Sequence, residues 1–459
     1  MGTRTRDDVT TGRTTVDRRT FIKTAGLTAS AAAGLTAAAG IESILAARRA
    51  PAFAQGTKLH IVRWVDFIPE ADLELKRQAP EASKALGAEV TFEFINANDL
   101  QARITAAIQS GSGADIIQML WNWPQLYANG LVDVSDVAEP IGRAQGGYYD
   151  VFTSTSKVGG RWLAVPHGTG GNAIAYRRSW HAEIGVKEFP KTWDEWREVG
   201  KKLKAKGKPV GQALGHSFGD PPTFAYPLLW DFGGAEVDTT GKKVVINSKG
   251  AVESVKFMQA FWKDACDEGG LAWDDTNNNR AFHSGDISAT LNGASIYIVA
   301  KRQKDKLKDE KGEPLYQDIE HAALLPKGPA GQFALYGAFQ HSVMKYSKNQ
   351  KLAKDLLKWM HQKENYGKWF QVNEGYTVGA TKVWEEDPMW SRIDKPLQIF
   401  RQAARQTRML GYPGPASAKA TESYTKYIIV DMYAKAVQGM KAEDAVKWAE
   451  GELKKVYEA

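Results

Sequence analysis

The sequence predicts an α/β fold of two lobes, in which each lobe is a mostly parallel sheet flanked by helices and hinge crossovers join the lobes. The chain has 459 residues, which is more than one compact domain usually holds. Strand and helix patterns alternate along its first part. Glycines at 168, 170 and 171 separate two extended segments, as expected where a chain crosses between lobes. These three observations favour the two-lobed arrangement.

The first part of the chain holds three strand patterns and two helix patterns. The strands are expected at 59–64, 89–94 and 114–119, and the helices at 73–86 and 99–109. Pro80 should break or kink the first helix, because proline lacks the backbone N–H. In a parallel sheet of this kind, ligands bind beyond the carboxyl ends of the strands. The segments that follow the first and third strands are therefore candidates for ligand binding.

The later elements are helices with recognisable ends. The Thr-Trp-Asp-Glu run that begins at Thr192 is a capping box and opens a helix. Ser248 precedes another helix, which Gly269-Gly270 closes. Apolar spacing predicts two further amphipathic helices at 421–437 and 443–456.

Residues 1–54 have the three parts of an export signal. A charged start holds Arg18-Arg19 followed by Thr-Phe-Ile-Lys, a weakly apolar middle is rich in Ala and Gly, and a small-residue segment ends at Ala54. The adjacent arginines match the twin-arginine motif, so we expect cleavage near Ala54 and export to the periplasm by the twin-arginine route. Because no run of about 18 strongly apolar residues occurs, we expect no membrane anchor.

Composition and motifs exclude several classes of function. The formal net charge is +7, but residues 1–54 hold eight Lys and Arg against four acids, which leaves about +3 on the mature chain. No arginine-rich stripe interleaved with aromatic residues occurs, and we expect no nucleic-acid partner. Cys266 is the only cysteine, which excludes an intrachain disulfide, a cysteine-based metal site and a lipoprotein anchor. Without a His-Glu-x-x-His, P-loop or Gly-x-Ser-x-Gly motif, we expect no catalytic residue, metal or cofactor.

Four stretches of the sequence carry a family resemblance. They are 114–134 (ADIIQMLWNWPQLYANGLVDV), 160–180 with 191–203 (GRWLAVPHGTGGNAIAYRRSW and KTWDEWREVGKKL), 281–295 (AFHSGDISATLNGAS) and 325–375. In this order, behind a cleavable leader, they resemble the family 1 extracellular solute-binding proteins, which include maltose-binding protein. Two places depart from the family pattern: Tyr176-Arg177-Arg178 replaces Tyr-Asn-Lys, and Ser295 replaces a frequent Trp.

The resemblance implies a periplasmic-binding-protein fold and a role in transport. Residues 58–171 with 293–365 would form lobe 1, and residues 172–292 with 366–459 would form lobe 2. The chain would be a monomeric, periplasmic substrate-binding component of an ABC importer. It would bind a small solute, a sugar or oligosaccharide, in the cleft between the lobes and pass it to the membrane permease subunits.

A sugar site needs flat aromatic faces for the C–H faces of the ring and planar polar groups for the hydroxyls. Residues of both kinds occur at the expected strand ends, at the crossover and in turns that resemble ligand-facing turns of the family. The candidate ligand-binding residues are Trp64, Asp66, Phe67, Gln118, Trp121, Asn122, Thr169, Asn172, Trp230, Asp231, Asn292, Ser295, Phe339, Gln340 and Tyr376. We expect Trp121 and Trp230 to face one cleft from opposite lobes.

Three alternatives remain open at this point. A periplasmic carbohydrate-active enzyme would need two carboxylates across a cleft. A polyamine receptor of the same fold would need several acids in the cleft, and the candidate segments offer mainly Asp66 and Asp231. A ferric-ion receptor would use paired tyrosines, for which Tyr148-Tyr149 is the adjacent pair.

Overall fold

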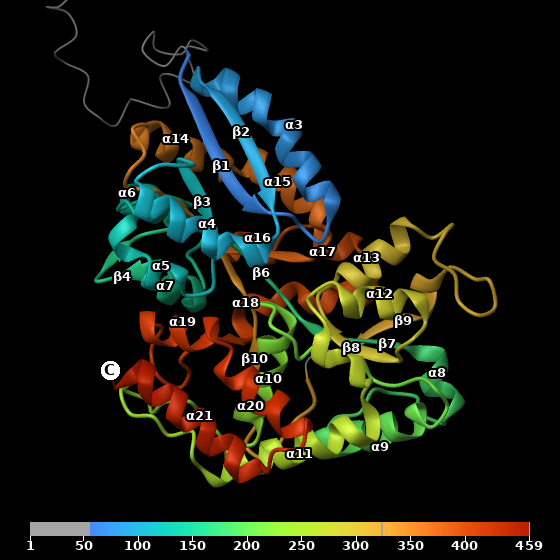
Figure 1. Cartoon of the computed structure of the whole chain (residues 1–459). Coiled ribbons are helices and arrows are strands. Elements are labelled where there is room, and N and C mark those ends of the chain that lie inside the picture. Colours follow the sequence, from blue (N-terminus) through green and yellow to red (C-terminus); the bar gives the residue numbers. More distant parts are fainter. Residues whose placement is uncertain (1–55, 323–324, 459) are drawn as a thin grey trace, which may run out of the picture.

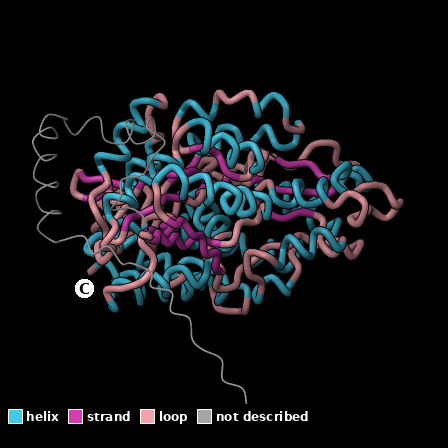
Figure 2. Tube along the Cα trace, turned by 90° about the horizontal axis from the view of Figure 1, so that it is seen from above, coloured by secondary structure: helices cyan, strands magenta, loops and turns pink. Residues whose placement is uncertain are grey.

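The computed structural model describes residues 56–322 and 325–458, which form two lobes of helices around two separate sheets (Figure 1). Seen from above, the strands lie in the interior and helices surround them (Figure 2). The predicted export signal at 1–54 lies outside the described residues. In the part of the chain that the structure describes, no helix is long and apolar enough to cross a membrane.

Lobe 1 is built on a six-stranded sheet with the strand order β12-β6-β11-β3-β1-β2. Its strands are β1 (Lys58–Trp64), β2 (Glu89–Ile95), β3 (Ile116–Leu120), β6 (Val165–Gly170), β11 (Ala338–Val343) and β12 (Thr377–Gly379). The β1–β2 and β1–β3 pairs are parallel, whereas the pairs made by β11 and β12 are antiparallel. The sheet is therefore mixed rather than mostly parallel, because β6 leads the chain out to the other lobe and β11 brings it back.

Helices cover lobe 1 on both faces of the sheet. They are α3 (Pro69–Leu86), α4 (Ala97–Ser110), α5 (Trp123–Leu126), α6 (Ser135–Ala144), α7 (Asp150–Ser156), α14 (Gln350–Met360), α15 (Lys363–Asn373), α16 (Lys382–Glu385), α17 (Met389–Arg392) and α18 (Ala403–Gln406). Helix α3 runs through Pro80 without ending, contrary to the expected break. Pro80 and Lys76, whose carbonyl loses its helical partner, both lie exposed, so the helix loses this hydrogen bond at a solvent-facing position rather than in the core.

Lobe 2 has a three-stranded sheet with the order β8-β7-β9. Its strands are β7 (Ala173–Arg177), β8 (Ala289–Asn292) and β9 (Ile319–Ala322), and its helices include α8 (Arg178–Glu183), α9 (Trp193–Lys204), α10 (Asp220–Asp231), α11 (Lys249–Ala265), α12 (Asn277–Ser284) and α13 (Ser295–Arg302). Both pairs in this sheet are antiparallel, so the expected parallel arrangement does not occur here.

The strand pairing moves the boundaries that the sequence predicted between the lobes. β9 lies within 293–365 but pairs with β7 of lobe 2, and β12 lies within 366–459 but pairs with β6 of lobe 1. The first crossover is where the sequence placed it, because β6 ends at Gly170 in one sheet and β7 begins at Ala173 in the other. The later crossovers join strands that are distant in sequence, which local patterns do not reveal.

The C-terminal segment packs mainly on lobe 2. It forms α19 (Ala418–Thr425), α20 (Ile428–Val437) and α21 (Ala442–Tyr457), of which α20 and α21 contact α11. The single helix predicted at 421–437 is interrupted at Tyr427, whose φ of 55° lies in the left-handed region. Helix α19 contacts α5 and so links the segment to lobe 1.

Two short strand pairs and four 3-10 helices complete the described part of the chain. β4 (Lys157–Val158) pairs with β5 (Arg161–Trp162), and β10 (Ala334–Leu335) pairs with β13 (Thr407–Arg408). The 3-10 helices are Ala128–Gly130, Glu268–Ala272, Leu315–Asp318 and Lys395–Gln402.

One side chain of lobe 2 forms hydrogen bonds and ion pairs with lobe 1 at the edge of the interface. Arg302, at the end of α13, donates to the carbonyl of Val372 at 2.8 Å and to the Glu374 carboxylate at 2.9 Å. It also pairs with Glu70 in the first turn of α3. These contacts connect the two lobes at this edge.

Candidate functional site

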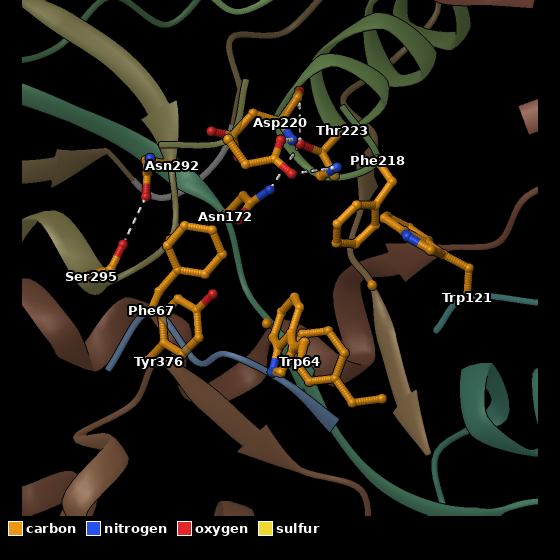
Figure 3. Close-up of a pocket in the computed structure, with 16 residues that line it drawn as sticks. Trp64, Phe67, Trp121, Asn172, Phe218, Asp220, Thr223, Asn292, Ser295 and Tyr376 are labelled. Carbon is orange, nitrogen blue, oxygen red and sulfur yellow. Dashed lines mark hydrogen bonds between the residues drawn. The ribbon is translucent and has the colours of Figure 1, made fainter. Parts of the chain in front are cut away.

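A cavity lies between the two sheets, where the strands β1, β6, β8 and β11 end or cross. It is a compact cavity that is partly open to solvent, with about 60 Å³ accessible to the centre of a water molecule. Its lining residues are Trp64, Phe67, Trp121, Gly170, Asn172, Phe218, Gly219, Asp220, Thr223, Asp275, Asn292, Gly293, Ser295, Gly337, Phe339 and Tyr376 (Figure 3).

Aromatic rings from lobe 1 form one wall of the cavity. The ring centroids of Trp64 and Phe339 are 4.7 Å apart, and Phe67 meets the edge of Trp64 at 5.9 Å. Tyr376 lies 6.0 Å from Phe67 and continues the wall. Gly293 faces this ring, and a Cβ there would lie 3.0 Å from it, so glycine permits the close approach. The wall offers the flat apolar faces that a pyranose ring requires.

Trp121 joins the wall from a strained turn after β3. Its φ is 51°, a conformation that bulky residues rarely adopt. Two hydrogen bonds hold the turn: its N–H donates to the carbonyl of Ala338 at 2.9 Å, and its carbonyl accepts from Gln340 Nε2 at 2.6 Å. The indole then packs on Tyr424 at 5.2 Å.

The opposite wall is polar and comes from the crossover and the start of α10. Asn172 Nδ2 donates to Thr223 Oγ1 at 2.9 Å, and both side chains face the open space from the side opposite Trp64 (Figure 3). The Asp275 carboxylate accepts the backbone N–H groups of Gly219 at 3.1 Å and Asp220 at 2.7 Å. It therefore caps the first turn of α10 from another part of the chain.

A second polar group lies where β8 ends. Ser295 Oγ donates to Asn292 Oδ1 at 3.1 Å, and Asn292 Nδ2 donates to Asn279. These side chains are fixed by one another, and they present amide and hydroxyl groups beside the aromatic wall (Figure 3). Planar amides and hydroxyls of this kind form hydrogen bonds with sugar hydroxyls.

The titratable side chains that line the cavity are acidic ones and a tyrosine. Burial and the neighbouring Asp275 raise the pKa of Asp220 well above its ordinary value, and burial raises the pKa of Asp275. Burial and the carboxylates of Asp66, Asp220 and Asp275 raise the pKa of Tyr376. Among the described residues, no Lys, Arg or His lines the cavity.

Eight of the fifteen candidate residues line the cavity, and their contact with a ligand remains a prediction. They are Trp64, Phe67, Trp121, Asn172, Asn292, Ser295, Phe339 and Tyr376. The other seven do not line it, and their side chains make hydrogen bonds or packing contacts elsewhere in the structure. They are Asp66, Gln118, Asn122, Thr169, Trp230, Asp231 and Gln340.

Four of these seven brace the backbone around the aromatic wall, and we call them the polar frame. Gln118 accepts from the Trp64 N–H at 3.1 Å, and Gln340 donates to the Trp121 carbonyl. The remaining two members donate to backbone carbonyls of later segments of the chain: Thr169 to Gly337 at 2.8 Å and Asn122 to Leu410 at 3.0 Å.

The other three are corrected as follows. Asp66 Oδ1 accepts from the Ile68 N–H at 2.9 Å and so belongs to the turn before α3. Asp231 accepts from Trp193 Nε1 and the Phe333 N–H, both at 2.8 Å, inside lobe 2. Trp230 is 3% exposed and packs on other aromatic rings, so it does not face Trp121 across the cavity. It sits near the end of α10, whereas the cavity lies at the start of that helix.

Sequence reasoning missed Phe218, Asp220, Thr223 and Asp275. A signal was present, because Gly219-Asp220-Pro221-Pro222 is a helix start, and the positive end of a helix is a common place for polar recognition. Asp275 caps a helix, but that helix is α10, which begins 55 residues earlier in the chain.

A two-lobed α/β fold with a cavity between its lobes is the arrangement of periplasmic solute-binding proteins. The comparison with known proteins places the chain within this class. It belongs to the bacterial extracellular solute-binding protein family, whose pattern matches residues 72–366. The family predicted from the sequence is thus confirmed, and so is the two-lobed α/β fold.

Individual relatives share part or most of the chain. It is 25% identical over 323 residues to a probable ABC transporter-binding protein of Deinococcus radiodurans, covering 67% of this chain and 74% of that protein. It is 28% identical over 190 residues to the diacetylchitobiose binding protein DasA of Streptomyces coelicolor, covering 38% of this chain and 42% of that protein. Its fold is similar to that of maltose-bound MalE3 of T. maritima, with a TM-score of 0.71 at 21% identity over 87% of this chain and 99% of that chain.

Proposed function

We propose that this chain is the receptor of an ABC importer for a sugar or oligosaccharide, which it binds between its lobes. The observation that carries the proposal is the pairing of an aromatic wall with a polar wall across one cavity. Stacked rings would cover the C–H face of a pyranose, and Asn172, Thr223 and Asn292 would bind its hydroxyls. Relatives named for diacetylchitobiose and maltose support a saccharide ligand.

The partners and the location follow from the same proposal. The loaded receptor would deliver its solute to the permease subunits in the membrane, as a monomer and without nucleic acid. The export signal at 1–54 would direct the chain to the periplasm by the twin-arginine route. We propose no catalytic step and no cofactor, because Asp220 and Asp275 lie together on one wall, whereas a glycosidase requires carboxylates on both sides of the bond.

The ferric alternative loses its main support in the structure. Tyr148 donates its hydroxyl to the carbonyl of Ala138 at 3.0 Å, and the hydroxyl of Tyr149 is bound to Glu385. Neither tyrosine lines the cavity. The two adjacent tyrosines are therefore held by separate partners rather than presented together to an ion.

A thermal-shift panel tests the proposal. A ligand that binds only the folded chain raises its melting temperature. The panel contains mono-, di- and oligosaccharides, polyol phosphates and polyamines. We expect at least one saccharide to raise the melting temperature and isothermal titration to confirm one site. A shift produced by polyamines or polyol phosphates alone would overturn the saccharide proposal.

A further inference from the structure

The charges at the cavity have one sign. Asp220 and Asp275 are the carboxylic side chains among those that line it, and the Asp66 carboxylate also acts on Tyr376 in its wall. Within residues 56–322 and 325–458, no Lys, Arg or His forms an ion pair with Asp220 or Asp275. Buried carboxylates without a cationic partner are costly, so this cavity disfavours an anionic solute and favours a cationic one.

The hydrogen bonds distinguish the two aspartates. Asp275 uses both carboxylate oxygens on the backbone N–H groups that begin α10. Asp220 uses Oδ2 to accept from Asn278 Nδ2 at 2.6 Å, and no partner is found for its Oδ1 in the described part of the chain. The residue is 8% exposed and lines the cavity. Asp220 thus keeps one acceptor atom without a hydrogen bond at the cavity wall, whereas both oxygens of Asp275 are used to cap α10.

The aromatic wall on the other side of the cavity is also compatible with a cation. Phe67 and Tyr376 lie on the side opposite Asp220 and Thr223 (Figure 3). Aromatic faces attract an ammonium group as well as the C–H face of a sugar. A solute that carries both groups would satisfy both walls at once.

From this arrangement we propose that the bound solute is an amino sugar, whose protonated amino group donates to Oδ1 of Asp220. This inference rests on the proposed function and specifies its substrate class. The ammonium group supplies the positive charge that the cavity lacks, and the sugar ring stacks on the aromatic wall. Sugars with a carboxylate or phosphate group are rejected.

The test uses three disaccharides with one skeleton. The β-1,4-linked glucosamine disaccharide carries free amino groups, cellobiose has hydroxyls in their place, and diacetylchitobiose has neutral amides. Isothermal titration at pH 6 compares their affinities for the mature protein. A charged hydrogen bond to a buried carboxylate should make the glucosamine disaccharide bind about ten- to a hundredfold tighter than cellobiose.

A variant pair assigns the effect to Asp220. In Asp220→Asn the amide oxygen still accepts from Asn278, so the fold should persist while the preference for the amine disappears. Asp444→Asn removes one exposed carboxylate from the first turn of α21 and should leave the preference unchanged.

A change of pH tests the same preference in the wild-type protein. At pH 9.5, where the amines of the glucosamine disaccharide are deprotonated, the preference should vanish.

The outcomes separate this inference from the proposed function. If cellobiose or diacetylchitobiose binds as tightly as the glucosamine disaccharide at pH 6, the amino-sugar inference is overturned and the saccharide receptor stands. If none of the three binds but spermidine does, the saccharide proposal fails and the amino-sugar inference fails with it. A preference that survives in Asp220→Asn also overturns the assignment.

Discussion

The sharpest test of the site compares one aromatic residue of the cavity with one of the interior. Phe67 lines the cavity and is only partly buried, whereas Trp230 is 3% exposed and packs on Tyr226, Phe333 and Tyr412. Phe67→Ala should weaken saccharide binding, and Trp230→Ala should weaken the fold. The two variants remove rings of similar kind from places that differ in function.

The magnitudes follow from what each ring covers. Loss of a stacking ring from a sugar removes roughly 1–3 kcal/mol, so Phe67→Ala should raise Kd by about ten- to a hundredfold. Its free energy of unfolding should fall by only about 1 kcal/mol, because the ring is partly exposed. Trp230→Ala leaves a large hole in lobe 2 and should lower the free energy of unfolding by about 3–5 kcal/mol, with Kd nearly unchanged.

Two measurements decide the comparison. Isothermal titration with the saccharide found in the thermal-shift panel gives Kd, and urea unfolding followed by circular dichroism gives stability. Phe67→Ala with normal affinity would show that the cavity is not the binding site. Trp230→Ala with lost affinity and normal stability would restore the original expectation that this indole stacks on the ligand.

Three further outcomes are expected. Arg302→Gln removes the ion pairs that Arg302 makes between the lobes, so small-angle scattering should show a larger radius of gyration, with Kd about three- to tenfold higher; an unchanged curve and Kd would contradict this role. Burial lowers the pKa of His361 to about 4, so below about pH 6.5 the unfolded chain binds a proton that the folded chain excludes. The stability advantage of wild type over His361→Gln should therefore fall by about 1.4 kcal/mol per pH unit between pH 6 and 4.5, and a constant difference in urea melts would refute this. Changing Arg18 and Arg19 to Lys should leave precursor in the cytoplasm, and an unchanged periplasmic yield would exclude the twin-arginine route.

Local patterns predicted the elements of this protein better than their pairing. The segments 59–64 and 89–94 alternate in polarity and 114–119 is a short buried run, and the structure has β1, β2 and β3 there. The antiparallel partners β11 and β12 come from residues more than two hundred positions later, and nothing in their own sequence states the direction of pairing. Lobe boundaries depend on such pairing and were misplaced for the same reason.

The candidate site was predicted by the same logic and has the same limits. Trp64 and Trp121 follow strands of the large sheet and reach the cavity, as the strand-end rule requires. Trp230 also lies near the end of an element, but that element is helix α10. The residues of α10 that line the cavity are at its start, not at its end. Asp220 and Asp275 meet through a contact between segments 55 residues apart, which spacing along the sequence does not reveal.

The polar frame has a consequence for how new specificities arise in such a protein. Gln118, Asn122, Thr169 and Gln340 fix the backbone of the aromatic platform, and these residues do not line the cavity. Thr223, which lines the cavity, stands instead on the first turn of α10. Substitutions on that turn alter recognition without disturbing the platform, so ligand preference and structural support vary independently. Libraries aimed at new solutes would therefore randomise the start of α10 and leave the frame intact.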